Sequence, residues 1–207
     1  MKKIAFVKCF SLIFFICVIM FGCAMGPQMT KIKGVWKYDQ YSGGYLDRIM
    51  IVGKPRMDAA RIEYEDYMIK ILKKRSVETI PSYTVIPDMK DLNRESVKQA
   101  ANAAGVKAVL ATKVVGVDEK EVVVSQSQKM DYVYTPNGVY MRPYLDGPKV
   151  VNFTKVRVET GLFELESEKL IWAATSAIMN PESAEEAIKD FSKAIVEQLT
   201  KDGYIRP

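Results

Sequence analysis

The sequence predicts an α/β (α+β) domain with a mixed parallel and antiparallel sheet and about three helices mainly on one face. Two early strands are each followed by a helical segment, and such crossovers are typical of parallel pairing. The later strands follow one another through short turns, which is typical of antiparallel hairpins. The expected order is β-α-β-α-β-β-β-β-α. Of the 207 residues 48% are hydrophobic and 27% charged, the composition of a folded globular chain.

The parallel half of the sheet is expected within residues 48–117. An apolar run at residues 48–53 predicts a short buried strand, and the apolar spacing of residues 58–75 predicts a helix. Glu63, Glu65 and Asp66 do not share the apolar face of this helix and are expected on its solvated surface. Residues 77–86 indicate extended structure in which Pro81 favours an edge or a bulge. We expect Asn93 to cap a second helix that ends at Gly105. Residues 106–117 are the strongest candidate for a central strand and continue through residues 122–124.

The antiparallel half is expected after residue 150. Residues 156–162 alternate between apolar and polar side chains, which predicts a half-buried strand. A charged turn then leads into the apolar strand 170–178, and we expect its Trp172 to be buried. The last helix is expected to begin with Asn180 as N-cap and Pro181 as first residue, and to end at Gly203.

The N-terminus has the pattern of an export signal. Three lysines precede an apolar run at residues 9–21, which as a helix would span roughly 20 Å, short of the ~30 Å hydrocarbon core. The run ends in Met20-Phe21-Gly22-Cys23, which resembles a bacterial lipobox. This resemblance implies that Cys23 is lipidated and becomes the mature N-terminus. The alternative is an ordinary signal peptide in which the cysteine is incidental.

Cleavage before Cys23 defines three expected regions: a lipoprotein signal peptide (residues 1–22), a lipid-anchored tether and lead-in (23–46), and a single α/β domain (47–207). The other two cysteines leave with the signal, so no disulfide and no cysteine metal site is expected. Ala24 after the cysteine favours outer-membrane sorting under enterobacterial rules. The domain is therefore expected at the periplasmic face of the outer membrane, attached to it through the lipid on Cys23.

Composition also narrows the function. The chain has no histidine, so Ser/His/Asp and Cys/His catalysis and the commonest metal ligand are absent. The net charge of +5 comes mostly from the signal lysines, and a nearly neutral mature chain does not indicate a nucleic-acid partner. We expect no catalytic residue, no metal and no cofactor. A paired-carboxylate hydrolase using Glu164, Glu166 and Glu168 is the remaining enzymatic alternative.

Residues 130–148 form the most informative segment, rich in tyrosine, proline and glycine. Asn137-Gly138 is a strong hairpin signal, so residues 132–134 and 139–141 are expected to pair in a projecting arm. Aromatic and arginine side chains are enriched at recognition sites. The candidate partner-binding residues are Tyr132, Tyr134, Tyr140, Arg142 and Tyr144. The alternative is that aromatic pairs across the hairpin only stabilise it.

Four segments carry a family resemblance. Residues 80–88 (IPSYTVIPD), 105–112 (GVKAVLAT), 170–175 (LIWAAT) and 201–205 (KDGYI) resemble a recurring group of small uncharacterised bacterial lipoproteins, in which a lipobox precedes a periplasmic α/β domain interrupted by a Tyr/Pro/Gly-rich loop. The element order is also similar to the TolB N-terminal module and to peptidoglycan-synthase activator lipoproteins. The resemblance implies a fold and a location, and it brings no catalytic residue with it.

These observations predict a non-enzymatic envelope lipoprotein that acts as a tethered binding or adaptor module. Its expected partner is a protein or a glycan of the envelope. Two alternatives stay open. The first is a self-assembling envelope assembly factor, a homo-oligomer that uses exposed strand edges or the arm for self-contact. The second is the carboxylate-based hydrolase.

Overall fold

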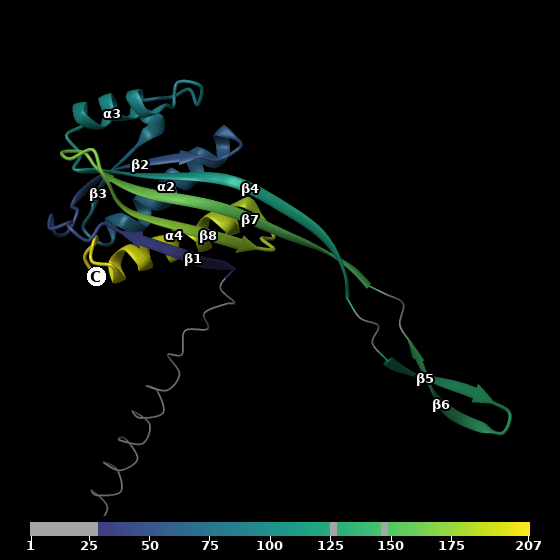
Figure 1. Ribbon diagram of the computed structural model, residues 1–207. Helices are drawn as coiled ribbons and strands as arrows, with labels where there is room; N and C mark the ends of the chain where they lie inside the picture. Colours follow the sequence, from purple (N-terminus) through teal and green to yellow (C-terminus); the bar gives the residue numbers. More distant parts are fainter. Residues whose placement is uncertain (1–28, 125–127, 146–148) are drawn as a thin grey trace, which may run out of the picture.

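The computed structural model describes residues 29–124, 128–145 and 149–207. Residues 1–28, with the expected signal peptide and Cys23, lie outside the described part. The described chain forms one six-stranded sheet, one two-stranded sheet and three helices, so the predicted mixed α/β class is confirmed (Figure 1). The helices are α2 (Asp58–Lys73), α3 (Arg94–Ala103) and α4 (Ala184–Lys201).

The large sheet has the order β1-β8-β7-β4-β2-β3. The central strand β2 pairs in parallel with β3 and β4, whereas β4–β7, β7–β8 and β8–β1 pair antiparallel, as the connection lengths predict. The strands are β1 (Thr30–Lys37), β2 (Arg48–Lys54), β3 (Glu78–Pro81), β4 (Ala108–Val124), β7 (Lys149–Glu164) and β8 (Leu170–Met179). A short 3₁₀ turn (Ser82–Thr84) follows β3, so the extended segment expected over residues 77–86 is shorter than predicted.

Strand β1 corrects the expectation that residues 23–46 are a tether and lead-in. Residues 30–37 pair with β8 and form an edge of the large sheet. The sequence hides this strand because lysines and Gly34 interrupt its apolar alternation, and lysines are typical of edge strands. A bulge between Ile32 and Gly34 exchanges the two faces of the strand. Ile32 packs on the helix-covered core, whereas Trp36 turns to the opposite face of the sheet.

Helices α2 and α4 pack together on one face of the sheet and close the main core (Figure 1). Trp172 is fully buried there, as predicted, and its indole Nε1 donates a hydrogen bond to Asp202 at 2.9 Å. Tyr64 of α2 reaches across to Thr112 of β4 at 2.8 Å, and burial raises the pKa of this phenol far above its ordinary value. The core side chains from the sheet include Ile51, Leu110 and Leu162.

Helix α3 lies on the opposite face, over β2 and the start of β4. It buries Ala101 against Met50 and Val109 in a second, smaller core. The predicted caps are confirmed: the Asn93 side chain accepts from two backbone N–H groups of the first turn, and Gly105 has φ +61° beyond the C-terminus. Since α3 is short, it covers only one end of this face.

Helix α4 begins three residues later than predicted. Asn180 has φ +47°, and its side-chain oxygen accepts from the Thr154 backbone N–H at 2.8 Å, so this asparagine ends β8 instead of capping the helix. Ser183 is the N-cap, with its hydroxyl accepting from the backbone N–H of Glu186 at 3.1 Å. The helix ends before Gly203, as expected.

A buried ion pair joins α2 to the segment after β3. Glu65 accepts hydrogen bonds from the Arg61 Nε at 3.1 Å and the Ser82 hydroxyl at 2.6 Å. Arg61 also donates to the Ile86 carbonyl at 2.9 Å, and both charged side chains are almost completely buried. The sequence pattern placed Glu65 on a solvated helix surface, which is wrong, because its partners come from residues far away in the chain.

Two strands extend well beyond the rest of the sheet. β2 pairs with β4 only as far as Lys113, and β8 pairs with β7 only as far as Lys155, whereas β4 and β7 pair with each other out to Val124 and Lys149. Past this two-stranded ribbon, β5 (Gln128–Thr135) and β6 (Gly138–Leu145) form the separate hairpin, which lies far from the helices (Figure 1). We call residues 128–145 the arm.

Candidate functional site

The arm is a two-stranded antiparallel hairpin with a two-residue turn. Tyr132 lies opposite Met141, and Tyr134 lies opposite Val139, so the segments predicted to pair do pair. Directly opposite residues project from the same face of an antiparallel pair, and alternate residues project from opposite faces. The register therefore divides the side chains of the arm between two faces that differ in chemistry.

One side of the hairpin, which we call the apolar face of the arm, has no charged side chain. Its tyrosines stand beside methionines, a valine and a proline, and five of its side chains are between 54% and 79% exposed. The apolar face consists of Met130, Tyr132, Tyr134, Val139, Met141 and Pro143. Contiguous exposed apolar surface of this kind marks an interaction site on a soluble domain.

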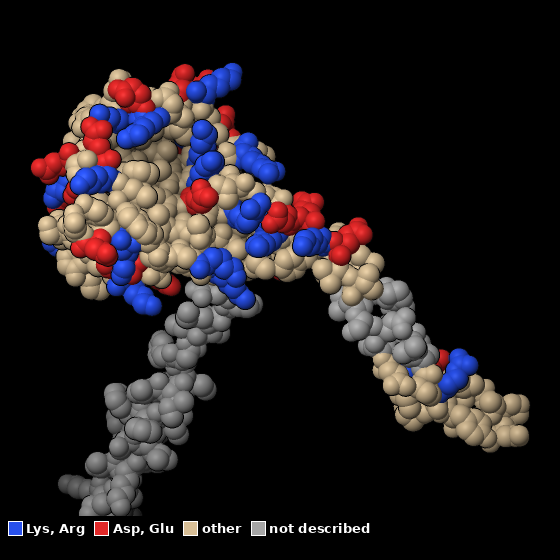
Figure 2. All heavy atoms as spheres, viewed as in Figure 1, with Lys and Arg blue, Asp and Glu red and all other residues tan. Residues whose placement is uncertain are grey.

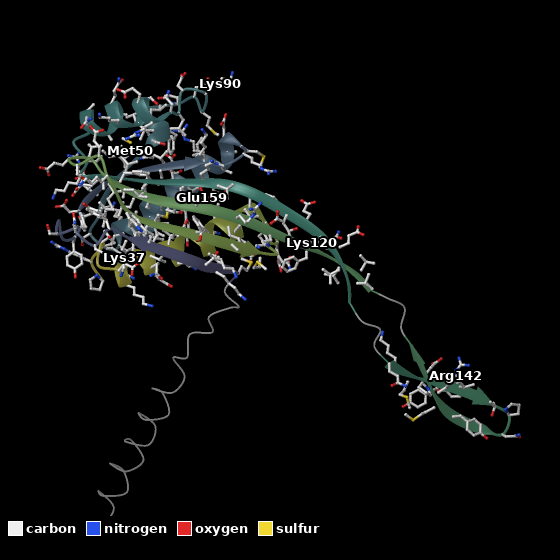
Figure 3. All side chains as sticks on the ribbon, viewed as in Figure 1. Lys37, Met50, Lys90, Lys120, Arg142 and Glu159 are labelled. Carbon is white, nitrogen blue, oxygen red and sulfur yellow. The ribbon has the colours of Figure 1, made fainter. Side chains whose placement is uncertain are left out.

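The opposite face of the arm is mixed. It presents Tyr140 and Arg142 together with Asp131 and the half-buried Val133. Figure 3 shows Arg142 on the hairpin, remote from every other labelled charge. The five predicted binding residues thus lie on one hairpin but do not share one face, and the backbone of Tyr144 pairs with Lys129 while its side chain lies outside the described part.

Sequence reasoning treated the tyrosines as a single group and missed the methionines and the valine. The signal that reveals them is the two-residue period of a β-strand, in which every second side chain lies on the same face. Met130, Tyr132 and Tyr134 recur at every second residue, as do Val139, Met141 and Pro143. Once a two-residue turn is assumed, these two series must meet on one face.

The charged residues of the ribbon are concentrated where it leaves the large sheet. Arg157 of β7 pairs with Asp118 of β4 at 3.2 Å, and Glu119, Lys120 and Glu121 follow directly. Figure 2 shows these charges at the base of the ribbon, and an almost uncharged end of the hairpin. The chain thus keeps its apolar face apart from the charged surface of the main body.

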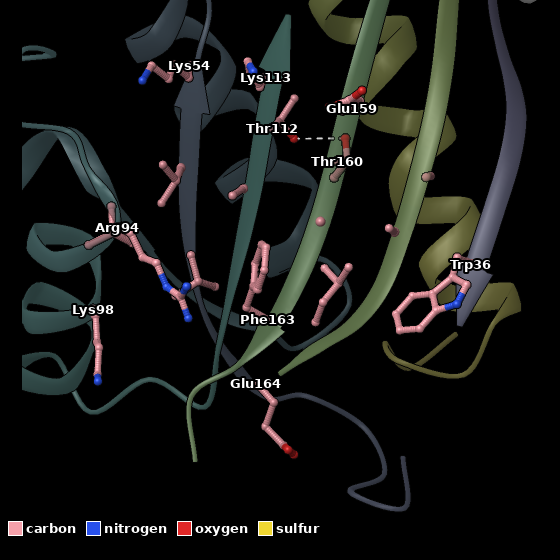
Figure 4. A pocket seen from close by; sticks show the side chains of 18 of the residues that line it. Trp36, Lys54, Arg94, Lys98, Thr112, Lys113, Glu159, Thr160, Phe163 and Glu164 are labelled. Atoms are coloured by element: carbon pink, nitrogen blue, oxygen red, sulfur yellow. Dashed lines mark hydrogen bonds between the residues drawn. The ribbon is translucent and has the colours of Figure 1, made fainter. Parts of the chain in front are cut away.

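A second apolar surface lies on the sheet face that α3 leaves uncovered. We call it the open groove, a hollow of about 960 Å³. Its floor is made of small side chains from adjacent strands, whereas Trp36 stands at the β1 side and Phe163 at one end, 48% and 41% exposed (Figure 4). The floor residues are Gly34, Ala111, Gly161, Ala173 and Thr175.

Phe163 narrows the groove at one end. A Cβ atom on Gly161 would come within 2.9 Å of the Phe163 ring, so the ring lies over a position that needs glycine. The sequence shows the floor as a run of small residues at alternate positions of the strands, for example Ala173 and Thr175.

Charged side chains border the groove, among them Glu159 of β7, which lies opposite the floor residue Thr175 at one end. Arg94 and Lys98 come from α3, and Lys54 and Lys113 lie at the other end (Figure 4). The Lys98 ammonium pairs with Glu168 at 2.6 Å, and this hydrogen bond lowers the pKa of the glutamate and raises that of the lysine. The groove is thus apolar inside and polar at its border.

Two of the three carboxylates proposed for a hydrolase are used in surface contacts. The Ser167 hydroxyl donates to Glu164 within the turn that joins β7 to β8, and Glu168 pairs with Lys98. In the described ranges no group of three or more acidic or cysteine side chains is arranged to hold a metal ion. Nor does any helix in those ranges have the length and apolarity needed to cross a membrane.

No family model and no curated protein matches this chain. Among solved structures, it is similar to the PelC dodecamer from Paraburkholderia phytofirmans at 11% identity, covering 83% of this chain and 98% of that one with a TM-score of 0.44. Lipoprotein GNA1162 from Neisseria meningitidis matches at 14% identity, covering 74% of this chain and 98% of that one with a TM-score of 0.40. A neuraminyllactose-binding hemagglutinin homologue from Helicobacter pylori matches at 11% identity, covering 78% of this chain and 88% of that one with a TM-score of 0.40.

At these levels of similarity the matches assign no function to this chain. One of them is described as a lipoprotein. The expected similarity to the TolB N-terminal module stays a prediction.

Proposed function

We propose that this protein is a non-enzymatic, lipid-anchored module of the bacterial cell envelope that binds a partner through the apolar face of its arm. In this proposal Cys23 carries the lipid, and the domain lies at the periplasmic face of the outer membrane. The observation that carries the proposal is the exposed apolar face at the end of a long ribbon. The lipobox pattern supports the anchor.

The energetics of the arm favour a binding role over a structural one. A two-stranded hairpin is at best marginally stable alone, and the arm makes no contribution to either core cluster. Large aromatic and methionine side chains that add nothing to the fold still cost solubility when they are exposed. Interface aromatics can each contribute ~2 kcal/mol or more of binding free energy, which gives a reason for keeping them.

The experiment compares the two faces of the arm. Tyr132→Ser with Tyr134→Ser removes the aromatic rings of the apolar face, and Tyr140→Ser removes one ring from the mixed face. Each variant is measured for its free energy of unfolding and for its ability to restore the phenotype of a strain that lacks the gene. We expect all variants to unfold like the wild type and only the apolar-face variant to lose function.

Two results would contradict the proposal. If the apolar-face variant unfolds or loses several kcal/mol of stability, these tyrosines belong to the fold. If it folds and restores the phenotype fully, the arm is not the binding element. The mixed-face variant controls for general damage to the hairpin.

A further inference from the structure

The open groove suits the side chains of another protein surface better than a small polar ligand. Small-molecule sites combine apolar walls with a few converging polar groups. Here the polar side chains of this sheet face, Lys113, Glu159 and Thr175, lie together at one end of the groove, and the hydroxyls of Thr112 and Thr160 bond each other at 3.1 Å on the helix-covered face. The rest of the floor is glycine and alanine.

Because its side chains are small, the floor also leaves room for a sheet surface with large side chains. Packed sheets lie about 10 Å apart with their side chains interlocked, so a face of small residues accepts a face of large ones. The apolar face of the arm is such a face, with exposed tyrosine and methionine side chains on a two-stranded hairpin. The chain thus contains two uncovered apolar surfaces of complementary size.

A single copy does not bring these surfaces together. The groove includes Ala111, near the start of β4, and the ladder between β4 and β7 continues without reversal to Val124. Those thirteen steps correspond to about 40 Å of extended chain before the arm begins. Figure 1 shows the arm beyond the far end of β4 and β7, away from the main body of the sheet.

From this complementarity we infer that the apolar face of the arm docks into the open groove of a second copy of the chain. Two copies that exchange arms reciprocally form a symmetric dimer, whereas copies that each pass an arm to the next one build a closed ring or an open chain. The inference rests on the proposed function and names the partner of the arm.

The available area supports a weak, repeatable contact. Six side chains, each with on the order of 100 Å² accessible, offer about 600 Å² on the arm. With a matching area in the groove the contact buries about 1,200 Å², at the lower end of specific interfaces. Assembly should therefore depend on protein concentration, and on confinement to a membrane surface, which raises the local concentration.

The test uses the full chain, extracted in a mild detergent, and native mass spectrometry to count copies. The arm variant carries Tyr132→Ser with Tyr134→Ser. The groove variant carries Ala173→Arg, which places a long charged side chain on the floor, and Thr175→Arg is a second groove variant at an exposed position. The controls are Tyr140→Ser on the mixed face and Ala103→Lys on the exposed side of α3.

We expect the wild type and both controls to form species of two or more copies, and the arm and groove variants each to be monomeric. Mixing the arm variant with a groove variant should restore one contact only. The groove variant supplies an intact arm and the arm variant supplies an intact groove. The mixture should therefore stop at a two-copy species that contains one of each.

Several results would overturn the inference. Assembly that survives both groove variants but not the arm variant means that arms contact arms. A monomeric wild type whose arm is needed for binding lipid vesicles means that the arm contacts a membrane. Absence of the mixed two-copy species means that the groove does not receive the arm. If the arm variant loses its role in cells while the wild type stays monomeric, the proposed function stands and the second copy is not the partner.

Discussion

The Glu65→Ala substitution tests the buried network that fixes the segment after β3. The Glu65 carboxylate accepts four hydrogen bonds: from Gly53 N at 2.9 Å, Arg61 Nε at 3.1 Å, the Ser82 hydroxyl at 2.6 Å and Tyr83 N at 3.1 Å. Its removal leaves the Arg61 guanidinium, 1% exposed, as a buried charge without a counter-charge. Breaking one side of a buried ion pair costs about 3–5 kcal/mol.

That loss is a large part of the 5–15 kcal/mol that typically separates folded from unfolded domains. Urea unfolding followed by circular dichroism should show it as a lower midpoint with an unchanged slope. Glu63→Ala on the same helix is the matched control and should cost less than about 1 kcal/mol.

The double variant Arg61→Met with Glu65→Leu separates the effect of the unpaired charge on stability from the effect of lost packing. Replacing both members of a buried pair by apolar side chains of similar volume is often neutral or stabilising. The backbone N–H groups of Gly53 and Tyr83 lose their acceptor in the double variant, so we expect it to recover only part of the stability lost by Glu65→Ala. A cost of Glu65→Ala below about 1 kcal/mol would refute the claim that this carboxylate compensates a buried charge.

Three further changes have defined outcomes. Trp172→Ala should cost ~3–5 kcal/mol as a large core truncation, whereas Trp36→Ala, at a half-exposed position, should cost far less in the same denaturation assay. Cys23→Ser should release the protein from membranes; persistence in the membrane pellet after a high-salt wash would contradict the lipid anchor. Burial alone would raise the pKa of Asp202, but hydrogen bonds from three side chains hold it below its usual value. The resulting stabilisation is complete above about pH 4 and is lost as pH falls through the lowered pKa, so Asp202→Asn should flatten the acid limb of a stability-against-pH curve.

The sequence predicted the elements whose signals are local. The apolar run of β2 and the Asn93 cap of α3 each depend on residues close together in the chain, and each was placed correctly. The hairpin of the arm was also predicted, but its turn residues are Pro136 and Asn137 instead of Asn137 and Gly138, because Gly138 pairs with Thr135. Strand β1 was missed because it is stabilised by pairing with β8, more than a hundred residues away, and not by its own alternation. The same holds for Ser183, which replaced Asn180 as the helix cap because Asn180 is bonded to Thr154.

The features related to function also divide into those that depend on local sequence and those that depend on residues distant in the chain. The tyrosines of the arm could be named from composition, but the separation of its two faces requires the register of the hairpin. The open groove could not be predicted, because its floor unites residues from strands β1, β4, β7 and β8 and exists only where α3 fails to cover them. Glu65 shows the reverse error, in which a charged side chain assigned to the surface is buried by partners distant in sequence.

Site-specific photocrosslinking in intact cells tests the central claim most directly. A photoreactive amino acid replaces Val139 on the apolar face or Arg142 on the mixed face, two positions three residues apart on the same strand. If the apolar face is the binding surface, position 139 gives a discrete crosslinked species and position 142 gives little or none. No adduct from position 139, or equal adducts from both positions, would contradict the claim that this face of the arm binds a partner.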